Sequence, residues 1–242
     1  MEHQRIHLEL SYNGGGYEGW QIQPSRKTVQ GTIEEILAKL NGNTPIRVTG
    51  CGRTDTGVHA HQYFAHFEGG FSDLDQLKYK LNKMLPNDIV IHTVCYNELH
   101  ARFDAKRRTY KYFICKHKDA FSHPFRWVFE RPLDLTAMNE ASKFLLGIHD
   151  FASFAKADTD VKTTLCEVFE IGWEETEHEY IYTVCANRFL RNMVRAMVGT
   201  FVDVGLGKIP PNELPKILAK RNRSEASESV PAQGLFLWKV EY

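Results

Sequence analysis

The chain has 242 residues and a formal net charge of zero, with 43% hydrophobic and 25% charged residues. This is the composition of an ordinary globular protein, and the length allows one large domain or two small ones. The polar start of the chain predicts no signal peptide, and the lack of a run of 18 apolar residues predicts no membrane span. The five cysteines are scattered, so we expect reduced thiols and a cytoplasmic protein.

The first part of the chain alternates strand and helix patterns. Thr28 is a typical helix cap, Ser72 or Asp73 caps a second helix, and that helix should end before Pro86. The expected segments are a strand at 5–12, a helix at 28–42, strands at 46–51 and 62–67, a helix at 72–85 and a strand at 88–94. This β-α-β-β-α-β order is that of a ferredoxin-like unit.

The second part of the chain predicts a similar unit with additions. The expected strands cover 109–116, 126–129, 166–173, 179–186 and 235–240; the expected helices cover 134–146, a long segment from about Asn187 to Phe201, and 212–220. We therefore expect an α+β protein of two ferredoxin-like halves, residues 1–105 and 106–242, with a cleft between them.

The segment Gly52–Ala60 is the strongest candidate for a site. Two glycines enclose Arg53 and Asp55, and glycine allows a backbone to turn with positive φ or to approach a ligand closely. An ionised carboxylate at such a turn can act as a nucleophile without a separate base. Spacing alone favours a structural turn over a catalytic one, because Asp and Gly are common turn residues.

Two other patterns favour ordinary structure over cofactors. Residues 14–19 match G-x-G-x-x-G after a strand, but Trp20 to Pro24 separate the last glycine from any helix, so we expect no bound dinucleotide. His59, His61 and His66 have no cysteine pair or further ligands at zinc-site spacing, so we expect polar histidines and no metal.

The charge is unevenly distributed although it sums to zero. Residues 102–118 contain seven Lys or Arg and one Asp, further Lys and Arg follow at 188–223, and six glutamates gather at 167–179. This segregation favours a basic surface that attracts a polyanion. A set of solvated charged faces is the other interpretation.

Several motifs occur together in one order along almost the whole chain. They are Tyr12-Asn13-Gly14, Gly19-Trp20-Gln21, Gly52-Arg53-Thr54-Asp55-x-Gly57-Val58-His59-Ala60, Ala101-Arg102-Phe103, Arg108-Thr109-Tyr110-Lys111-Tyr112, His149-Asp150-Phe151, Phe189-Leu190-x-x-Met193-Val194-Arg195 and Gly234-Leu235-x-Leu237. In these motifs the chain resembles the tRNA pseudouridine synthase A family. The resemblance implies the pseudouridine synthase fold.

The resemblance also implies an activity and a set of residues. The activity is isomerisation of uridine to pseudouridine at positions 38 to 40 of the tRNA anticodon stem-loop, without a cofactor. Asp55 would be the catalytic carboxylate, attacking the base or the sugar or removing a sugar proton, and Arg195 would pair with it. Arg53 would hold the backbone of the flipped nucleotide, while Tyr110 and Leu235 would contact the two faces of its base.

The resemblance further implies that tRNA is the partner and that the protein is a homodimer. A non-catalytic RNA-binding module is the competing hypothesis, because paired sheets of this topology also occur in RNA-binding domains. The aromatic sheet motif of such domains is absent from the sequence, which argues against that hypothesis.

Overall fold

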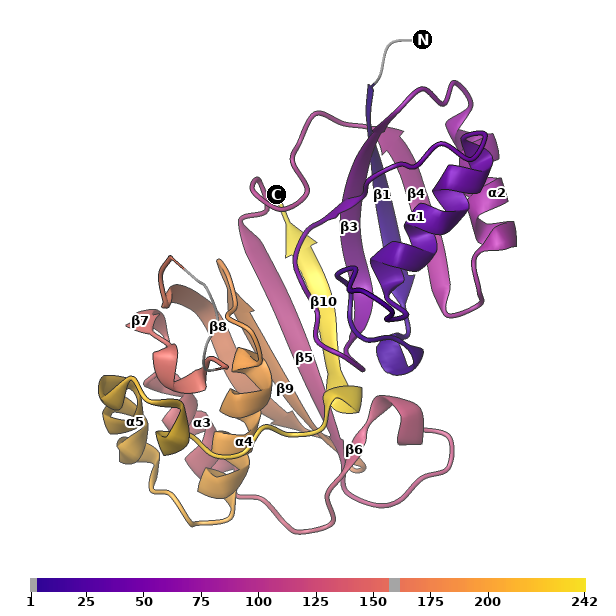
Figure 1. The fold of residues 1–242 in the computed structure, drawn as a ribbon. Helices are drawn as coiled ribbons and strands as arrows, with labels where there is room; N and C mark the ends of the chain where they lie inside the picture. Colours follow the sequence, from indigo (N-terminus) through magenta and orange to yellow (C-terminus); the bar gives the residue numbers. More distant parts are fainter. Residues whose placement is uncertain (1–3, 157–161) are drawn as a thin grey trace. The chain divides into compact units, whose positions relative to one another are not determined.

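The computed structural model describes residues 4–156 and 162–242 (Figure 1). The chain divides into two compact units: unit 1 comprises Met1–Lys106 with Leu237–Tyr242, and unit 2 comprises Arg107–Phe236. Each unit combines antiparallel strands with helices, so the predicted α+β class is confirmed. No helix of the described ranges is both long and apolar enough to cross a membrane.

Unit 1 is built on the predicted β-α-β-β-α-β order. Its elements are β1 (Gln4–Tyr12), α1 (Val29–Leu40), β2 (Thr49–Gly50), β3 (His59–Gly69), α2 (Leu74–Met84) and β4 (Ile89–Tyr96). The strands lie in the order β4-β1-β3, β2 pairs with the outer side of β3, and the last residues of β10 (Leu235–Glu241) also neighbour β3. Both helices lie along the same side of these strands (Figure 1).

The helix limits of unit 1 follow from local chemistry. Thr28 Oγ1 accepts a hydrogen bond from Gly31 N at 3.2 Å and begins α1. Asp73 Oδ1 does the same for Gln76 N at 2.8 Å and begins α2. The helix α2 ends at Met84, as expected ahead of Pro86, because a proline disfavours helical backbone at the residue before it.

One predicted strand of unit 1 is mostly wrong. Residues 46–51 were expected to form a strand, but only Thr49–Gly50 form β2 and pair with β3; Cys51 N adds one hydrogen bond to Phe64 O at 2.8 Å. Val48 N instead donates to Glu34 Oε1 at 2.9 Å, and Val48 O accepts from Gln30 Nε2 at 2.9 Å. Side chains of α1 thus satisfy the backbone groups that a neighbouring strand would otherwise pair.

Within unit 2 the antiparallel strands follow the order β5-β9-β8-β7, and β6 adds a short parallel pairing with β5. Its strands are β5 (Arg107–Cys115), β6 (Trp127–Val128), β7 (Gly147–Asp150), β8 (Leu165–Glu175) and β9 (Glu179–Ala186). Its helices are α3 (Leu135–Lys143), α4 (Met193–Gly205) and α5 (Leu214–Lys220). The strand β10 begins in this unit, at Leu235.

The long helix of unit 2 starts later than predicted. It begins at Met193 and not near Asn187, and Asn192 before it has a left-handed φ of 66°. Asn187 is still tied to the strand β8: its N donates to Glu167 O at 3.0 Å, and its Oδ1 accepts from Glu167 N at 3.0 Å. The helical apolar periodicity therefore begins before the helix itself, where the backbone is still bonded to a strand.

Candidate active site

Asp55 begins a tight turn in unit 1. Asp55 O accepts a hydrogen bond from Val58 N at 3.1 Å, and Gly57 at the third position has a φ of 78°. A positive φ at that position is the requirement of a type II turn, which glycine meets without strain. Asp55 is half-buried, and Arg53, two residues earlier, is exposed.

The glycine-rich loop at 14–19 packs directly against this turn. A Cβ on Gly14 would lie 1.9 Å from Val58 O, far inside van der Waals contact. Gly14 N donates to the Nδ1 atom of the buried His59 at 3.0 Å. Gly14 is therefore required by the close approach of two backbones, and His59 has a structural hydrogen bond.

The other end of the same loop makes a second backbone contact. Gly19 has a φ of 84°, and a Cβ there would lie 2.5 Å from Thr54 O. Trp20 N donates to Thr54 O at 3.3 Å, and Gly57 N donates to Tyr17 O at 3.3 Å. The glycines of the G-x-G-x-x-G pattern thus allow close packing against the loop of residues 52–60, called the Asp55 loop below. The next α-helix begins only at Val29 and not at the last glycine.

Buried aromatic residues support the Asp55 loop from the sheet. The rings of Trp20 and Tyr63 stack with centroids 4.1 Å apart, and Tyr12 meets Tyr63 edge-on at 5.5 Å. Tyr63 OH donates to Gly52 O at 2.5 Å, and Tyr12 OH shares a hydrogen bond with Thr54 Oγ1 at 2.8 Å. Phenol hydroxyls from two neighbouring strands therefore hold the residues on both sides of Arg53.

A hollow of about 220 Å³ opens beside Arg53 in unit 1. Trp20, Gln21, Gln30 and Gly52 contribute to its lining, and its charged lining residues are Arg53 and Arg102. The two guanidinium groups provide donors suited to phosphate or carbonyl oxygens. The hollow can therefore accept an anionic or carbonyl-rich group next to the Asp55 loop.

Tyr110 and Leu235 occupy buried positions in unit 2. Tyr110 lies in β5 opposite Val184 of β9, is 9% exposed, and meets Phe189 edge-on with ring centroids 4.9 Å apart. Leu235 is the first residue of β10 and is 5% exposed.

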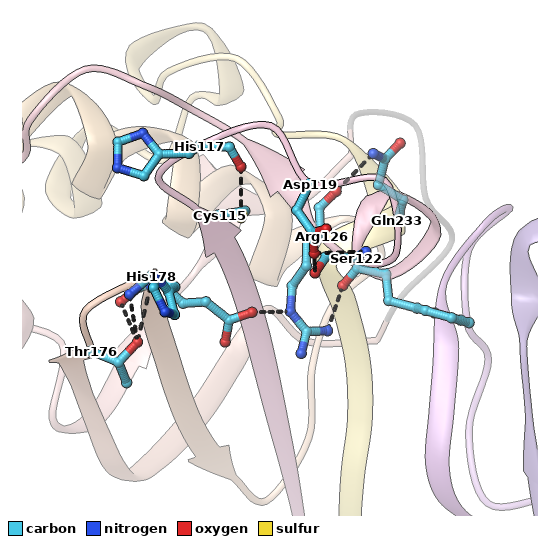
Figure 2. Close-up of polar contacts among 10 residues, drawn as sticks. Cys115, His117, Asp119, Ser122, Arg126, Thr176, His178 and Gln233 are labelled. Carbon is cyan, nitrogen blue, oxygen red and sulfur yellow. Dashed lines mark hydrogen bonds and ion pairs between the residues drawn. The ribbon is translucent and has the colours of Figure 1, made fainter.

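Gln233 fixes the turn just before Leu235, and the sequence analysis did not identify it. Its Nε2 donates to Arg126 O at 2.8 Å (Figure 2). The same atom donates to His123 O at 3.3 Å. Arg126 is itself held by an ion pair with Glu179, shown in the same view. Glutamine is a common surface residue, so no feature of the sequence marks this anchoring role.

Arg195 lies in the third position of α4 and is half-buried. Its Nε donates to Val230 O at 2.7 Å, and Val230 N donates to Arg195 O at 3.3 Å. Burial raises the pKa of Tyr112, and the charge of Arg195 acts in the opposite direction. The guanidinium is thus oriented by the main chain of the segment that leads to β10.

The predicted site residues are distributed over both units. Arg53 and Asp55 share one loop of unit 1, whereas Tyr110, Arg195 and Leu235 belong to unit 2. Of the other histidines considered for a metal, His61 stacks on Trp238 at 4.3 Å and His66 Nδ1 accepts from Ala101 N at 3.1 Å. Within 4–156 and 162–242, no three His, Cys, Asp or Glu side chains gather as metal ligands.

Comparison with known proteins places the chain among close relatives. Residues 141–242 match the family described as tRNA pseudouridine synthase. The chain is 46% identical to tRNA pseudouridine synthase A of Parabacteroides distasonis over 99% of its length and 96% of the relative. It is 45% identical to the protein of that name from Bacteroides fragilis, over 100% of the chain and 98% of the relative. It is 41% identical to tRNA pseudouridine synthase A 1 of Bacillus cereus, over 98% of each.

Proposed function

This chain belongs to the tRNA pseudouridine synthase A family, and we propose that it converts uridine to pseudouridine at positions 38 to 40 of the tRNA anticodon stem-loop. The observation that carries the proposal is the fixed Asp55 loop beside a hollow lined by Arg53 and Arg102. A carboxylate in the same loop as a cationic donor suits action on one nucleotide of a polyanion.

The proposed reaction is an isomerisation. The target uridine first leaves the stem, because an enzyme cannot reach the reacting atoms of a stacked base. The C–N bond between uracil N1 and the ribose carbon breaks, the uracil turns, and a bond forms between its C5 and the same ribose carbon. The hydrogen of C5 leaves as a proton and N1 gains one, so no oxidant or other co-reactant is consumed.

Asp55 is the proposed catalytic residue. Its carboxylate attacks the base or the ribose, or it removes a proton from the ribose; all three routes require it to be ionised and fixed. The turn closed by Val58 N and Gly57 supports this role, since it holds the residue in one backbone conformation. Such preorganisation lowers the cost of reaching the transition state.

The remaining roles are proposed from the family resemblance. Arg53 holds the backbone of the extruded nucleotide, which suits its exposed position at the hollow. Tyr110 stacks on the target base and Leu235 packs on its other face. Arg195 pairs with the catalytic carboxylate and keeps it ionised, a role that suits a guanidinium already oriented by Val230 O.

The proposal extends to assembly and cofactors. We propose a homodimer that acts on tRNA in the cytoplasm and needs neither metal nor nucleotide cofactor. Sedimentation of the protein alone should give the mass of a dimer, and sedimentation with tRNA should give the mass of a dimer plus bound tRNA. A monomer in both measurements would contradict the proposed assembly without affecting the proposed reaction.

Replacing Asp55 is the sharpest test of the activity. We expect Asp55→Asn to abolish release of tritium from tRNA labelled at uracil C5, because the amide has nearly the same shape but cannot act as a nucleophile or base. Affinity for tRNA should remain within a few-fold of the parent. Nucleotide-resolution mapping of pseudouridine in the treated tRNA then identifies the modified positions.

Three outcomes separate the hypotheses. Undiminished tritium release by Asp55→Asn excludes this carboxylate as the catalyst. Pseudouridine formed only outside positions 38 to 40 contradicts the proposed site in tRNA. Tight binding of tRNA by the unsubstituted protein, with no pseudouridine formed, supports the non-catalytic RNA-binding module.

A further inference from the structure

Phe103 presents an aromatic ring to solvent in unit 1. Its side chain is 75% exposed, although phenylalanine is a residue type that folding usually buries. One face of the ring stacks on His100, with centroids 4.2 Å apart and planes 26° from parallel. With three quarters of the side chain exposed, the ring is accessible to a second flat group.

The turn that carries Phe103 is held by histidine side chains. His100 Nδ1 accepts hydrogen bonds from Arg102 N and Phe103 N, each at 3.2 Å. His66 Nδ1 accepts from Ala101 N at 3.1 Å, and the His66 ring meets His100 edge-on at 4.7 Å. Asp104 Oδ2 accepts from His100 N at 2.6 Å. The exposed ring therefore stands on a fixed base, and little conformational freedom is lost when a ligand binds it.

Cationic groups connect this ring with the hollow beside the Asp55 loop. Arg102 lies over the Phe103 ring at 5.8 Å and also lines the hollow. Arg53 lines the same hollow. A fixed aromatic face with arginines beside it is the combination by which proteins bind single-stranded nucleic acid, with bases on the ring and phosphates on the cations.

We propose that Phe103 stacks on an unpaired base of the RNA substrate while Arg102 and Arg53 bind the adjoining phosphates. This proposal rests on the tRNA substrate proposed above and adds a recognition site outside the reacting base. Because every base has a π-face, the site recognises that a nucleotide is unstacked and depends little on which base it carries.

The test measures binding of an anticodon stem-loop RNA to the Asp55→Asn protein, so that turnover does not interfere. In that background we expect Phe103→Ala to weaken binding roughly 5- to 150-fold, the range measured for loss of one base–aromatic stack. Phe103→Trp should keep the affinity within a few-fold, because its ring also stacks. The matched control is Phe121→Ala, which removes a ring that is 91% exposed in unit 2 and should leave affinity unchanged.

A second set of RNAs identifies the base. Each unpaired loop nucleotide is replaced in turn by an abasic residue, which keeps the phosphate and removes the base. One abasic position should weaken binding to the Asp55→Asn protein by the same factor as Phe103→Ala, and should have no further effect on the doubly substituted protein. That coupling is expected only if the missing base and the missing ring touch.

Either of two results overturns the proposal. One is parental affinity of Phe103→Ala; the other is weakened binding that no abasic position reproduces, which would indicate a phosphate or protein contact instead of a base. Failure of the proposed function is a different result, namely absence of pseudouridine in tRNA treated with the unsubstituted protein. The binding measurements do not depend on that outcome.

Discussion

At the scale of single residues, the position of the Asp55 loop depends on the absence of a Cβ atom at Gly14. Gly14 faces Val58 O so closely that a Cβ would lie 1.9 Å from it. We expect Gly14→Ala to separate the two loops, to lower the free energy of unfolding by about 1–3 kcal/mol, the usual cost of forcing atoms into a packed site, and to reduce pseudouridine formation. Urea denaturation and the tritium-release rate measure the two effects.

Gly16 provides the control, since it lies in the same loop but a Cβ there meets nothing within 4 Å. Gly16→Ala should change both stability and rate little. Equal losses in the two variants would mean that the loop is sensitive to any substitution and that the contact with Val58 O is not the cause.

A second residue-scale prediction concerns His66. Burial, and to a smaller extent electrostatic repulsion from His100, Arg5 and His7, lower its pKa to about 4, while Glu68 opposes this shift. In the unfolded chain the same group titrates near its ordinary pKa of about 6.5. The unfolded state therefore binds a proton that the folded state rejects, and stability should fall as pH decreases from about 6.5 to 4.

The expected loss from His66 is on the order of 2 kcal/mol over that interval. His66→Gln keeps an acceptor for Ala101 N but cannot titrate, so its free energy of unfolding should vary less between pH 6.5 and 4. The measurement is urea denaturation at several pH values. An equally steep decrease in His66→Gln would assign the pH dependence to other groups, His7 among them, since burial also lowers its pKa.

At the scale of elements, periodicity predicted most of the helices and strands but not all of their ends. The caps Thr28 and Asp73 were readable because their side chains bond to the nearest backbone groups. The strand expected at 46–51 failed because Gln30 and Glu34 of α1 bind Val48 instead. Such competition between a side chain and a strand partner depends on the fold, and the local pattern does not contain it.

The candidate site shows the same division. The Asp55 loop was chosen as a candidate because its motif resembles that of a known family; its spacing alone favours an ordinary turn. Gln233 and the exposed ring of Phe103 were not assigned roles, because Gln233 acts through the carbonyls of Arg126 and His123 and Phe103 through its stack on His100. The first contact joins segments far apart in sequence, and the second depends on the conformation of a local turn; residue patterns contain neither.

Two tyrosines on neighbouring strands of unit 2 give a prediction at this scale. Tyr182 of β9 is fully buried, and its hydroxyl has no hydrogen-bond partner in the part of the chain that the structure describes. A buried hydroxyl without a partner costs stability. We expect Tyr182→Phe to raise the free energy of unfolding by about 1 kcal/mol, measured by urea denaturation.

Tyr112 of β5 is the matched control, because it lies directly opposite Tyr182 and is equally buried. Its hydroxyl donates to Pro231 O at 2.7 Å. Tyr112→Phe removes that bond and should lower the free energy of unfolding by about 1 kcal/mol. If both variants shift the free energy of unfolding in the same direction, the presence or absence of a hydrogen-bond partner for each hydroxyl does not determine the effect.

At the scale of the whole molecule, the net charge of zero hides an uneven use of charge. Four of the five Lys and Arg at 208–223 are matched by nearby carboxylates: Lys208 by Asp203, Lys216 by Glu213, Lys220 by Glu225 and Arg221 by Asp150. These ion pairs reduce the positive potential that the sequence alone attributes to the segment. The arginines at the hollow are then the stronger candidates for binding phosphates.

This distinction predicts a difference in salt dependence. The affinity for tRNA should fall steeply as salt rises, because each phosphate contact releases bound counterions. We expect Arg53→Gln to reduce the slope of log affinity against log salt by about 0.7 to 0.9, the contribution of one phosphate. Lys216→Gln removes the same charge from an ion-paired position and should leave the slope unchanged. A flat salt response in the unsubstituted protein would contradict phosphate binding altogether, and equal slopes in the two variants would remove Arg53 from the RNA contact.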